Sequence, residues 1–158
     1  MSGDVQYDHR DRCAIVGIGQ TDYSRNSGRS DLTLATQAAL AAIADAGLQP
    51  DDIDGIVRCD MDTVYHHDLV ESAGLPNVTY WSEVGPGGVA ASAMVGQAVG
   101  AILSGQATTV LVFRELNGRS GRRYGMSIEK ANKPDNIAYT ILGLGLNKCT
   151  RRLSTRLW

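Results

Sequence analysis

Apolar runs and helical stripes alternate along this chain. The run from Cys13 to Gly19 is continuously apolar, which is typical of a strand buried on both faces. The run from Val78 to Val84 alternates and is rich in aromatic and β-branched residues, which also favours a strand. Two further runs predict strands, so the four expected strands are Cys13–Gly19, Ile53–Val57, Val78–Val84 and Thr108–Phe113.

Helical patterns separate these strands. Ser30 or Asp31 is placed to cap a helix, and Gly47 stands where a helix of that length is expected to end. The apolar stripe of this helix consists of Leu32, Ala35, Ala39, Ala42 and Ile43. A shorter helix is expected over His66–Ala73, ending at Gly74. The alternation of strands and helices predicts an α/β protein with a largely parallel sheet.

A third helix, expected over Val89–Leu103, is the most informative element. It carries no charge, and most of its residues are alanine, glycine or serine. Since a helix without a polar face has to be buried on nearly all sides, we expect tight packing around it. Glycine within a helix costs about 1 kcal/mol relative to alanine, which such packing would offset.

Composition narrows the class of protein. The 158 residues fit one domain, 43% of them are hydrophobic, and the formal net charge is −2. A nucleic-acid partner is not expected, because it would call for a clustered basic face. The first eleven residues lack the apolar core of a secretory signal. The uncharged stretch from Val84 to Phe113 is too interrupted to predict a membrane span. The odd number of cysteines, without metal-like spacing, favours free thiols and a cytoplasmic location.

The turn Gly85-Pro86-Gly87-Gly88 precedes the uncharged helix. Free N–H groups at such a helix entry can hold an oxyanion, so Gly85, Gly87 and Gly88 are candidate substrate contacts. The alternative is a tight strand-to-helix turn that needs positive φ angles. The pattern leaves both open.

Other candidate groups give weaker signals. Arg119, Arg122 and Arg123 form a basic run that is either a solvated loop or a contact for coenzyme A phosphates. The motif Gly17-x-Gly19-x-x-Asp22 lacks the third glycine of a dinucleotide site.

Several aromatic and acidic residues near the predicted strands receive no role in binding or catalysis. A metal site at His66-His67-Asp68 is disfavoured, because adjacent side chains diverge. Glu115 follows the fourth strand and is given no role. Tyr65, Tyr80 and Trp81 are expected to pack or to line a dimer interface.

Several stretches together resemble the sterol-carrier-type thiolases and their lipid-transfer relatives. They are Ala14–Tyr23, Asp31–Ala35, Ala41–Leu48, Asp51–Ile56 and Ala90–Ile102 followed by Val110–Val112. The resemblance implies the N-terminal βαβαβαβ half of a thiolase-like fold with a buried central helix. It also implies acyl-CoA as substrate, no further cofactor, a homodimer, and for some steroid side-chain aldolases a separate OB-fold partner.

The chain departs from the thiolase pattern where the nucleophile is expected. Aligning the small-residue helix puts Gly85 at the position of the thiolase cysteine. Cys13 and Cys59 are expected to lie in the core, and Cys149 is far away in sequence. No catalytic residue is therefore assigned. We expect that each cysteine can be changed to alanine without loss of any acyl-CoA cleavage shown by a full-length version of the protein.

Three functions follow from this resemblance. The first is a retro-aldolase of lipid or steroid acyl-CoA metabolism, from the lineage that lacks the cysteine. The second is an acetyl-CoA acyltransferase, and the third is a non-catalytic pseudo-thiolase that interacts with a partner.

The resemblance also divides the chain. Residues 1–11 form a polar segment, residues 12–141 an incomplete thiolase-like domain, and residues 142–158 an atypical tail. The tail is interpreted as a truncated or frameshifted end, or else as a divergent amphipathic segment. We expect the isolated chain to associate and to lack turnover, because the apolar helix and strands would expose surface.

Overall fold

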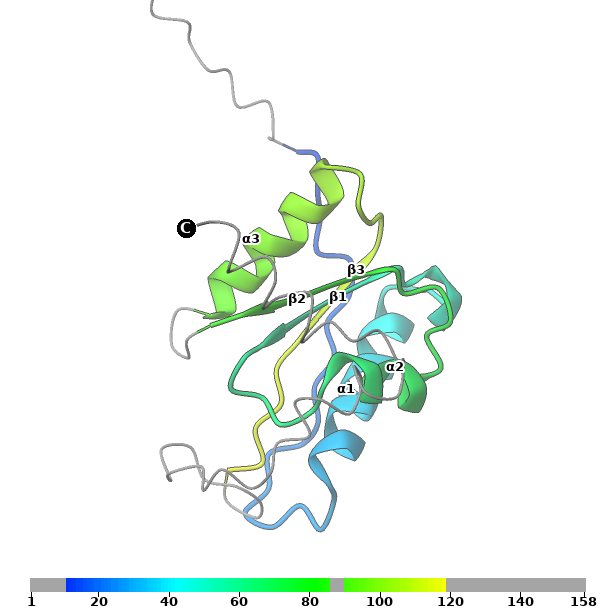
Figure 1. Cartoon of the computed structure of the whole chain (residues 1–158). Helices are drawn as coiled ribbons and strands as arrows, with labels where there is room; N and C mark the ends of the chain where they lie inside the picture. Colours follow the sequence, from blue (N-terminus) through cyan, green and yellow to red (C-terminus); the bar gives the residue numbers. More distant parts are fainter. Residues whose placement is uncertain (1–10, 86–89, 119–158) are drawn as a thin grey trace, which may run out of the picture. The chain divides into compact units, whose positions relative to one another are not determined.

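A three-stranded parallel sheet forms the centre of the protein. In the computed structural model, which describes residues 11–85 and 90–118, the strands are β1 (Gly55–Cys59), β2 (Tyr80–Val84) and β3 (Val110–Phe113). Their order is β2-β1-β3, so β1 is central (Figure 1). Three of the four predicted strands are thereby confirmed. β1 begins two residues later than expected, at Gly55 rather than Ile53.

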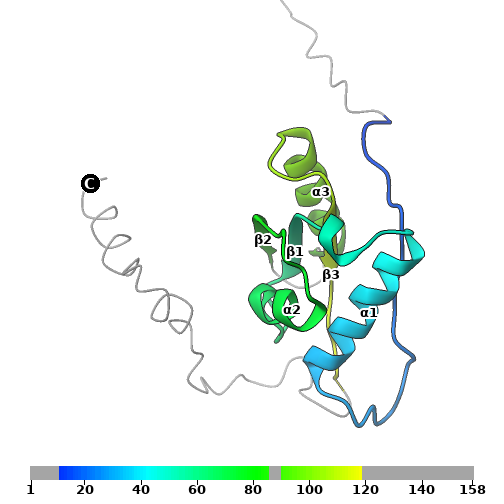
Figure 2. The same ribbon diagram turned by 90° about the vertical axis from the view of Figure 1, so that its right-hand side faces the viewer.

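Helices cover both faces of this sheet. α1 (Asp31–Asp45) and α2 (His66–Ala73) lie on one face, and α3 (Ala90–Leu103) lies on the other (Figures 1 and 2). A short 3-10 helix, η1 (Pro50–Asp52), precedes β1. The chain moves from β1 outward to β2 and then back past β1 to β3. Because parallel crossovers are right-handed, reversing the direction places α2 and α3 on opposite faces.

Alternating residues of each strand build two separate cores. Ile56 of β1 joins Leu111 and Phe113 of β3 against α1 and α2, in the larger core. Val57 and Cys59 of β1 pack against α3 in the smaller core, whose helix residues are Ala90, Met94 and Ala98. This alternation is the period-two pattern of a strand that is buried on both faces.

Both early helices begin and end as predicted. The Ser30 hydroxyl accepts a hydrogen bond from the Thr33 N–H at 3.1 Å, which caps α1. Gly47 and Gly74 follow the ends of α1 and α2 with φ of 68° and 65°, a conformation that glycine adopts at little cost.

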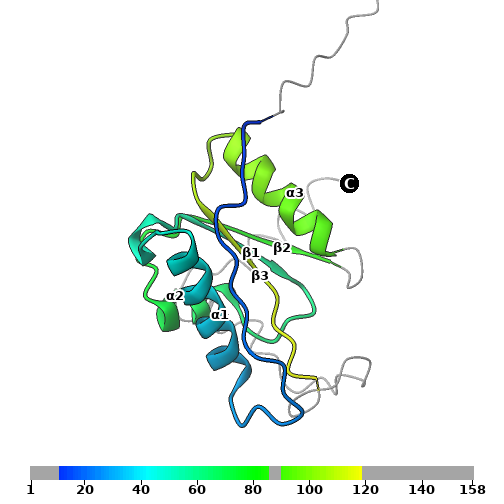
Figure 3. The same cartoon turned by 180° about the vertical axis from the view of Figure 1, so that it is seen from behind.

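The N-terminal segment, residues 13–19, is not a strand, contrary to the prediction. It runs extended beside α1 (Figure 3), and no described strand pairs with it. Ile15, Val16 and Ile18 are 75%, 62% and 74% exposed, and Cys13 is only partly buried. The reason is that the segment lies against α1, where Gly17 and Gly19 approach the helix backbone and the Ile18 N–H donates to Asp45, so among the described residues it joins no strand ladder.

Two glycines attach the N-terminal segment to α1. A Cβ atom built on Gly17 would lie 2.8 Å from the Cβ of Ala46 and closer still to the Ala42 carbonyl oxygen. One built on Gly19 would overlap the α1 backbone at Ala38 and Ala42. The Ile18 N–H also donates to Asp45 Oδ2 at 2.8 Å. The segment therefore lies directly on the helix backbone.

Among the described residues, α3 is covered on one face, whereas the sequence predicts cover on nearly all sides. Its buried residues, Ala90, Met94, Ala98 and Ala101, face the sheet. Val95 is 40% exposed, and open space surrounds the Cα positions of Gly96 and Gly100. Within the described residues, all three strands of the sheet pack against this helix. Its burial on the other side stays a prediction for a larger assembly.

Asp54 joins the starts of all three strands. Its main chain leads into β1, and its carbonyl oxygen accepts hydrogen bonds from Thr79 and Tyr80 N–H at the start of β2. Its carboxylate accepts from the N–H groups of Thr108 and Thr109 and from the Thr108 hydroxyl, before β3. Partial burial would raise the pKa of Asp54, but these hydrogen bonds outweigh it and lower the pKa.

Within residues 11–85 and 90–118, no helix has both the length and the apolar character needed to cross a membrane. The predicted boundary between residues 141 and 142 lies outside the described residues.

Candidate functional site

Charged and polar groups that could bind or act on a ligand gather at the carboxyl edge of the sheet. Asp60 follows β1, Gly85 follows β2, and Arg114 and Glu115 follow β3. Ligands of open α/β sheets bind outside the carboxyl ends of the strands, where the direction of winding reverses. Here the chain reverses around β1, so this edge is the candidate site.

Asp60 and Gly85 are in direct contact. The Asp60 N–H donates to the Val84 carbonyl at 3.0 Å, which extends the β1–β2 pairing by one residue. A Cβ atom built on Gly85 would lie 2.7 Å from Asp60 Oδ1 and closer still to the other two carboxyl atoms. The Asp60 carboxylate therefore fills the space that a side chain at position 85 would need. Asp60 itself is partly exposed.

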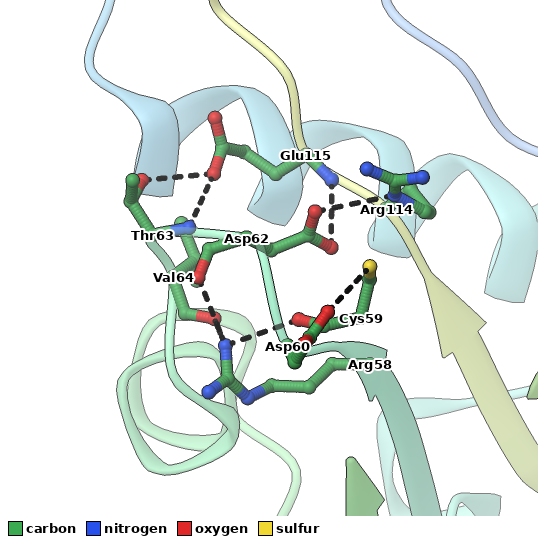
Figure 4. Close-up of polar contacts among 8 residues, drawn as sticks. All are labelled: Arg58, Cys59, Asp60, Asp62, Thr63, Val64, Arg114 and Glu115. Carbon is green, nitrogen blue, oxygen red and sulfur yellow. Dashed lines mark hydrogen bonds and ion pairs between the residues drawn. The ribbon is translucent and has the colours of Figure 1, made fainter. Parts of the chain in front are cut away.

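Cys59 lies beside this carboxylate but is not a reactive thiol. It is 0% exposed, and its sulfur donates to Asp60 Oδ1 at 3.5 Å (Figure 4). Burial raises the pKa of the Cys59 thiol, so the thiolate is disfavoured at neutral pH. The expected burial of Cys59 is confirmed, whereas Cys13 is only partly buried and lies outside the core. Cys149 lies outside the described residues.

Arg58 holds the turn that carries Asp60. This guanidinium is 3% exposed, and its Nη1 donates to the carbonyl oxygens of Cys59, Asp62 and Val64 at 3.4, 3.0 and 3.2 Å. Its Nη2 forms an ion pair with Glu83 of β2, and the Tyr65 ring lies beneath the guanidinium, 4.6 Å from Cζ to the ring centroid. The charge is therefore used to fix the loop rather than to meet a ligand.

Two buried carboxylates link this turn to the end of β3 (Figure 4). Asp62 accepts hydrogen bonds from Arg114 Nε and from the Glu115 N–H, both at 3.2 Å. Glu115 in turn accepts from the N–H and hydroxyl of Thr63, at 3.0 and 2.9 Å. Burial raises the pKa of Asp62, although the hydrogen bond from Glu115 and the charge of Arg114 oppose the rise. Both carboxylates hold the loop in shape.

The histidine pair is placed for packing. His66 stacks on Trp81 of β2, with ring centroids 4.0 Å apart and an interplanar angle of 7°. Burial, followed by the charges of His67 and Arg58, lowers the pKa of His66 to about 4. The described part of the chain contains no group of three or more His, Cys, Asp or Glu side chains that could hold a metal ion.

A separate polar pocket of about 280 Å³ lies between residues 19–27, α1 and residues 114–117. Thr21, Tyr23, Arg114 and Glu115 are among its lining residues. Asp60 and Gly85 do not line it, so it is distinct from the carboxylate contact.

Of the predicted site residues, only Gly85 is described, and it lies at the carboxyl edge of the sheet. Gly87, Gly88, Arg119, Arg122 and Arg123 lie outside the described residues. Sequence reasoning missed Arg58, Asp60 and Asp62. An arginine within the otherwise apolar stretch Gly-Ile-Val-Arg-Cys was the available signal, because arginine is almost never fully buried without a partner.

Comparison with known proteins places this fold in a class. No family model matches the sequence. The chain is 45% identical over 138 residues to a steroid side-chain-cleaving aldolase of Thermomonospora curvata, an alignment that covers 85% of this chain and 35% of that protein. It is 47% identical over 114 residues to a 17-hydroxy-3-oxo-4-pregnene-20-carboxyl-CoA lyase of Mycobacterium tuberculosis, covering 72% of this chain and 30% of that protein.

Solved structures agree with these sequence relatives. An Ltp2-ChsH2(DUF35) aldolase superposes with a TM-score of 0.67 at 44% identity, over 85% of this chain and 34% of that one. A monomeric SCP2-thiolase-like protein of Mycobacterium smegmatis follows with a TM-score of 0.56 at 27% identity, over 65% of this chain and 23% of that one. The chain spans about a third of the length of the curated relatives that it matches.

The parallel sheet with helices on both faces and these likenesses define a thiolase-like α/β fold. Within that class, the resemblance of the chain to the lipid-transfer branch, which includes the steroid side-chain aldolases, is confirmed.

Proposed function

We propose that this chain is part of a thiolase-like aldolase that cleaves a carbon–carbon bond in the side chain of a steroid CoA ester. The observation that carries the proposal is the identity of 45% and 47% with an aldolase and a CoA-ester lyase of steroids. The carboxyl edge supports the same chemistry, because it presents a carboxylate against Gly85 and no accessible thiol from Cys59.

Retro-aldol cleavage needs no nucleophile on the protein. A base takes the proton of the hydroxyl that stands β to the thioester carbonyl, and the O–H electron pair forms a ketone. The carbon–carbon bond breaks, and its electron pair passes to the α-carbon of the acyl-CoA. That carbon then takes up a proton, so the reaction balances without an oxidant, a reductant or a further cofactor.

The cysteine-dependent acyltransferase, the second of the three functions, is less well supported. A thiolase-type acyl-enzyme needs an accessible thiolate. Burial disfavours the thiolate of Cys59, and Cys13 lies on the N-terminal segment beside α1, away from the carboxyl edge.

A second protein belongs to the proposal. One structural neighbour is an aldolase made of two named components, Ltp2 and a DUF35 protein. We extend this to the whole protein that corresponds to our chain, and expect it to bind a DUF35-type, OB-fold partner. The homodimer stays a prediction.

A chimera tests the activity. The aligned part of the Thermomonospora aldolase is replaced by the corresponding residues of this chain, and the product is purified together with a DUF35-type protein. With the 17-hydroxy steroid CoA ester as substrate, we expect a 17-ketosteroid and a shortened acyl-CoA, measured by chromatography.

The unmodified relative and the isolated chain serve as controls, and the isolated chain is expected to be inactive. A chimera that folds and binds the partner but does not cleave the ester would contradict the aldolase proposal. That outcome would favour the non-catalytic pseudo-thiolase.

A further inference from the structure

The Asp60 carboxylate fills the space that a side chain at position 85 would need, on the carboxyl edge of the sheet. The contact is steric: all three atoms of the Asp60 carboxyl group lie within 2.7 Å of the place where a Cβ of residue 85 would stand. Carbon and oxygen atoms that are not bonded do not approach so closely. Residue 85 can therefore carry a side chain only if the Asp60 carboxylate moves.

The surrounding structure holds Asp60 in this place. Its N–H is fixed to Val84, directly before Gly85, and the Cys59 thiol donates to its Oδ1. Next to it, Arg58 secures the main chain on both sides of the turn through three carbonyl oxygens. The nearby cation Arg114 is engaged by Asp62 through Nε. Among the described residues, the Cys59 thiol is the donor to the Asp60 carboxylate, so lone pairs remain for a donor from outside.

From this geometry we infer that Asp60 determines the chemistry of position 85. It offers a fixed proton acceptor to a hydroxyl group of the substrate, and its negative charge suppresses any nucleophilic thiolate or anion there. Asp60 therefore contacts a hydroxyl group on the carbon chain of the substrate. It does not suit a reaction in which an acyl group is transferred to the protein. The identity of that hydroxyl, the one β to the thioester, rests on the proposed function.

The test uses the full chain and needs no turnover. Gly85→Cys introduces a thiol beside Asp60, and its alkylation by iodoacetamide is followed between pH 6.5 and 9.5 by site-resolved mass spectrometry. The Asp60 carboxylate has to turn away from the new Cβ, but its main chain stays paired with Val84 beside position 85. Since a nearby carboxylate raises a thiol pKa by about one unit, we expect Asp60→Asn to speed alkylation of the introduced thiol about tenfold at neutral pH. Gln106→Cys is a control for the reactivity of the reagent, because Gln106 is exposed just after α3. The alkylation rate of this thiol should be the same with and without Asp60→Asn.

Asp51→Asn is the matched control variant, because Asp51 is exposed at the opposite edge of the sheet. It should leave the alkylation rate of the thiol introduced by Gly85→Cys unchanged. An alkylation rate that is the same with and without Asp60→Asn would overturn the inference. If Gly85→Cys does not fold, Asp60→Gly in the same chain should restore folding by emptying the occupied space. Failure of that rescue would also overturn it.

Kinetics in the chimera separate this inference from the proposed function. With lyase activity present, Asp60→Asn should lower kcat at least a hundredfold, with little change in KM. Unchanged kcat would remove Asp60 from the reaction and leave the aldolase proposal intact. Absence of activity in the unsubstituted chimera counts against the aldolase proposal, while the alkylation result still decides on Asp60.

Discussion

Two extended segments of similar apolar character have different environments in this protein. The N-terminal segment reads Cys-Ala-Ile-Val-Gly-Ile-Gly and is largely exposed, whereas β1 reads Gly-Ile-Val-Arg-Cys and is buried at every position. The less polar of the two is thus the more exposed. β1 lies between two strands and has helices on both faces, whereas among the described residues the N-terminal segment pairs with no strand and lies against α1.

The largest effect should come from removing the charge that β1 buries. Arg58→Ala leaves Glu83 without its ion pair and three carbonyl oxygens without a donor, so we expect a loss of about 3 kcal/mol or more in the free energy of unfolding. Val16→Ser in the N-terminal segment should change it by less than about 0.5 kcal/mol. Urea unfolding followed by circular dichroism measures both. Similar losses for the two variants would contradict the comparison.

A side chain at Gly19 should detach the N-terminal segment. Gly19→Val forces a side chain into the α1 backbone, and overpacking of this kind costs about 1–3 kcal/mol. Hydrogen exchange at the Ile18 amide, which is bonded to Asp45, should speed up. Gly96→Ala is the control: it points into open space on α3 and should stabilise the helix by about 0.5–1 kcal/mol. Slow exchange at Ile18 in Gly19→Val would show that the contact is not tight.

Sequence patterns were reliable where local chemistry decides the structure. The Ser30 cap, the glycines after α1 and α2, and three strands follow from neighbouring residues, and all are observed. The environment of residues 13–19 and the exposed face of α3 depend on segments distant in sequence, which periodicity does not specify. Likewise, the Asp60–Gly85 contact joins residues from two strands, and only the parallel register brings them together.

The region around β1 should also carry a pH dependence that the N-terminal segment lacks. The pKa of His66 is lowered from 6.5 to about 4 in the folded state. Between these values the unfolded chain binds more protons, so stability should fall as the pH is lowered from 6.5 to 4. His66→Phe, which keeps a ring on Trp81, should weaken this decline in thermal unfolding. His67→Phe removes only the smaller, electrostatic contribution to the lowered pKa of His66, so it should weaken the decline less, and an equal effect of both variants would contradict the prediction.

The smallest change in stability is expected for the exposed side chains of the N-terminal segment. Ile15→Ser with Ile18→Ser should hardly alter unfolding, since these side chains are 75% and 74% exposed. It should, however, reduce association of the isolated chain, because exposed apolar surface drives self-association at about 25 cal/mol per Å² buried. Light scattering across a concentration series measures this. Unchanged association would contradict this prediction and indicate that the exposed face of α3 drives the association instead.

Asp54 has a consequence for how the sequence of this protein can vary. Asp54 fixes the start of every strand. Its main chain leads into β1, its carbonyl oxygen holds the start of β2, and its carboxylate holds the start of β3. A residue inserted between Asp54 and Thr79, or between Tyr80 and Thr108, therefore has to be accommodated in the connecting loops and helices, since the strand starts are pinned. Length differences among homologous chains should accordingly gather in the connections, while the spacing from Asp54 to the end of β1 stays constant.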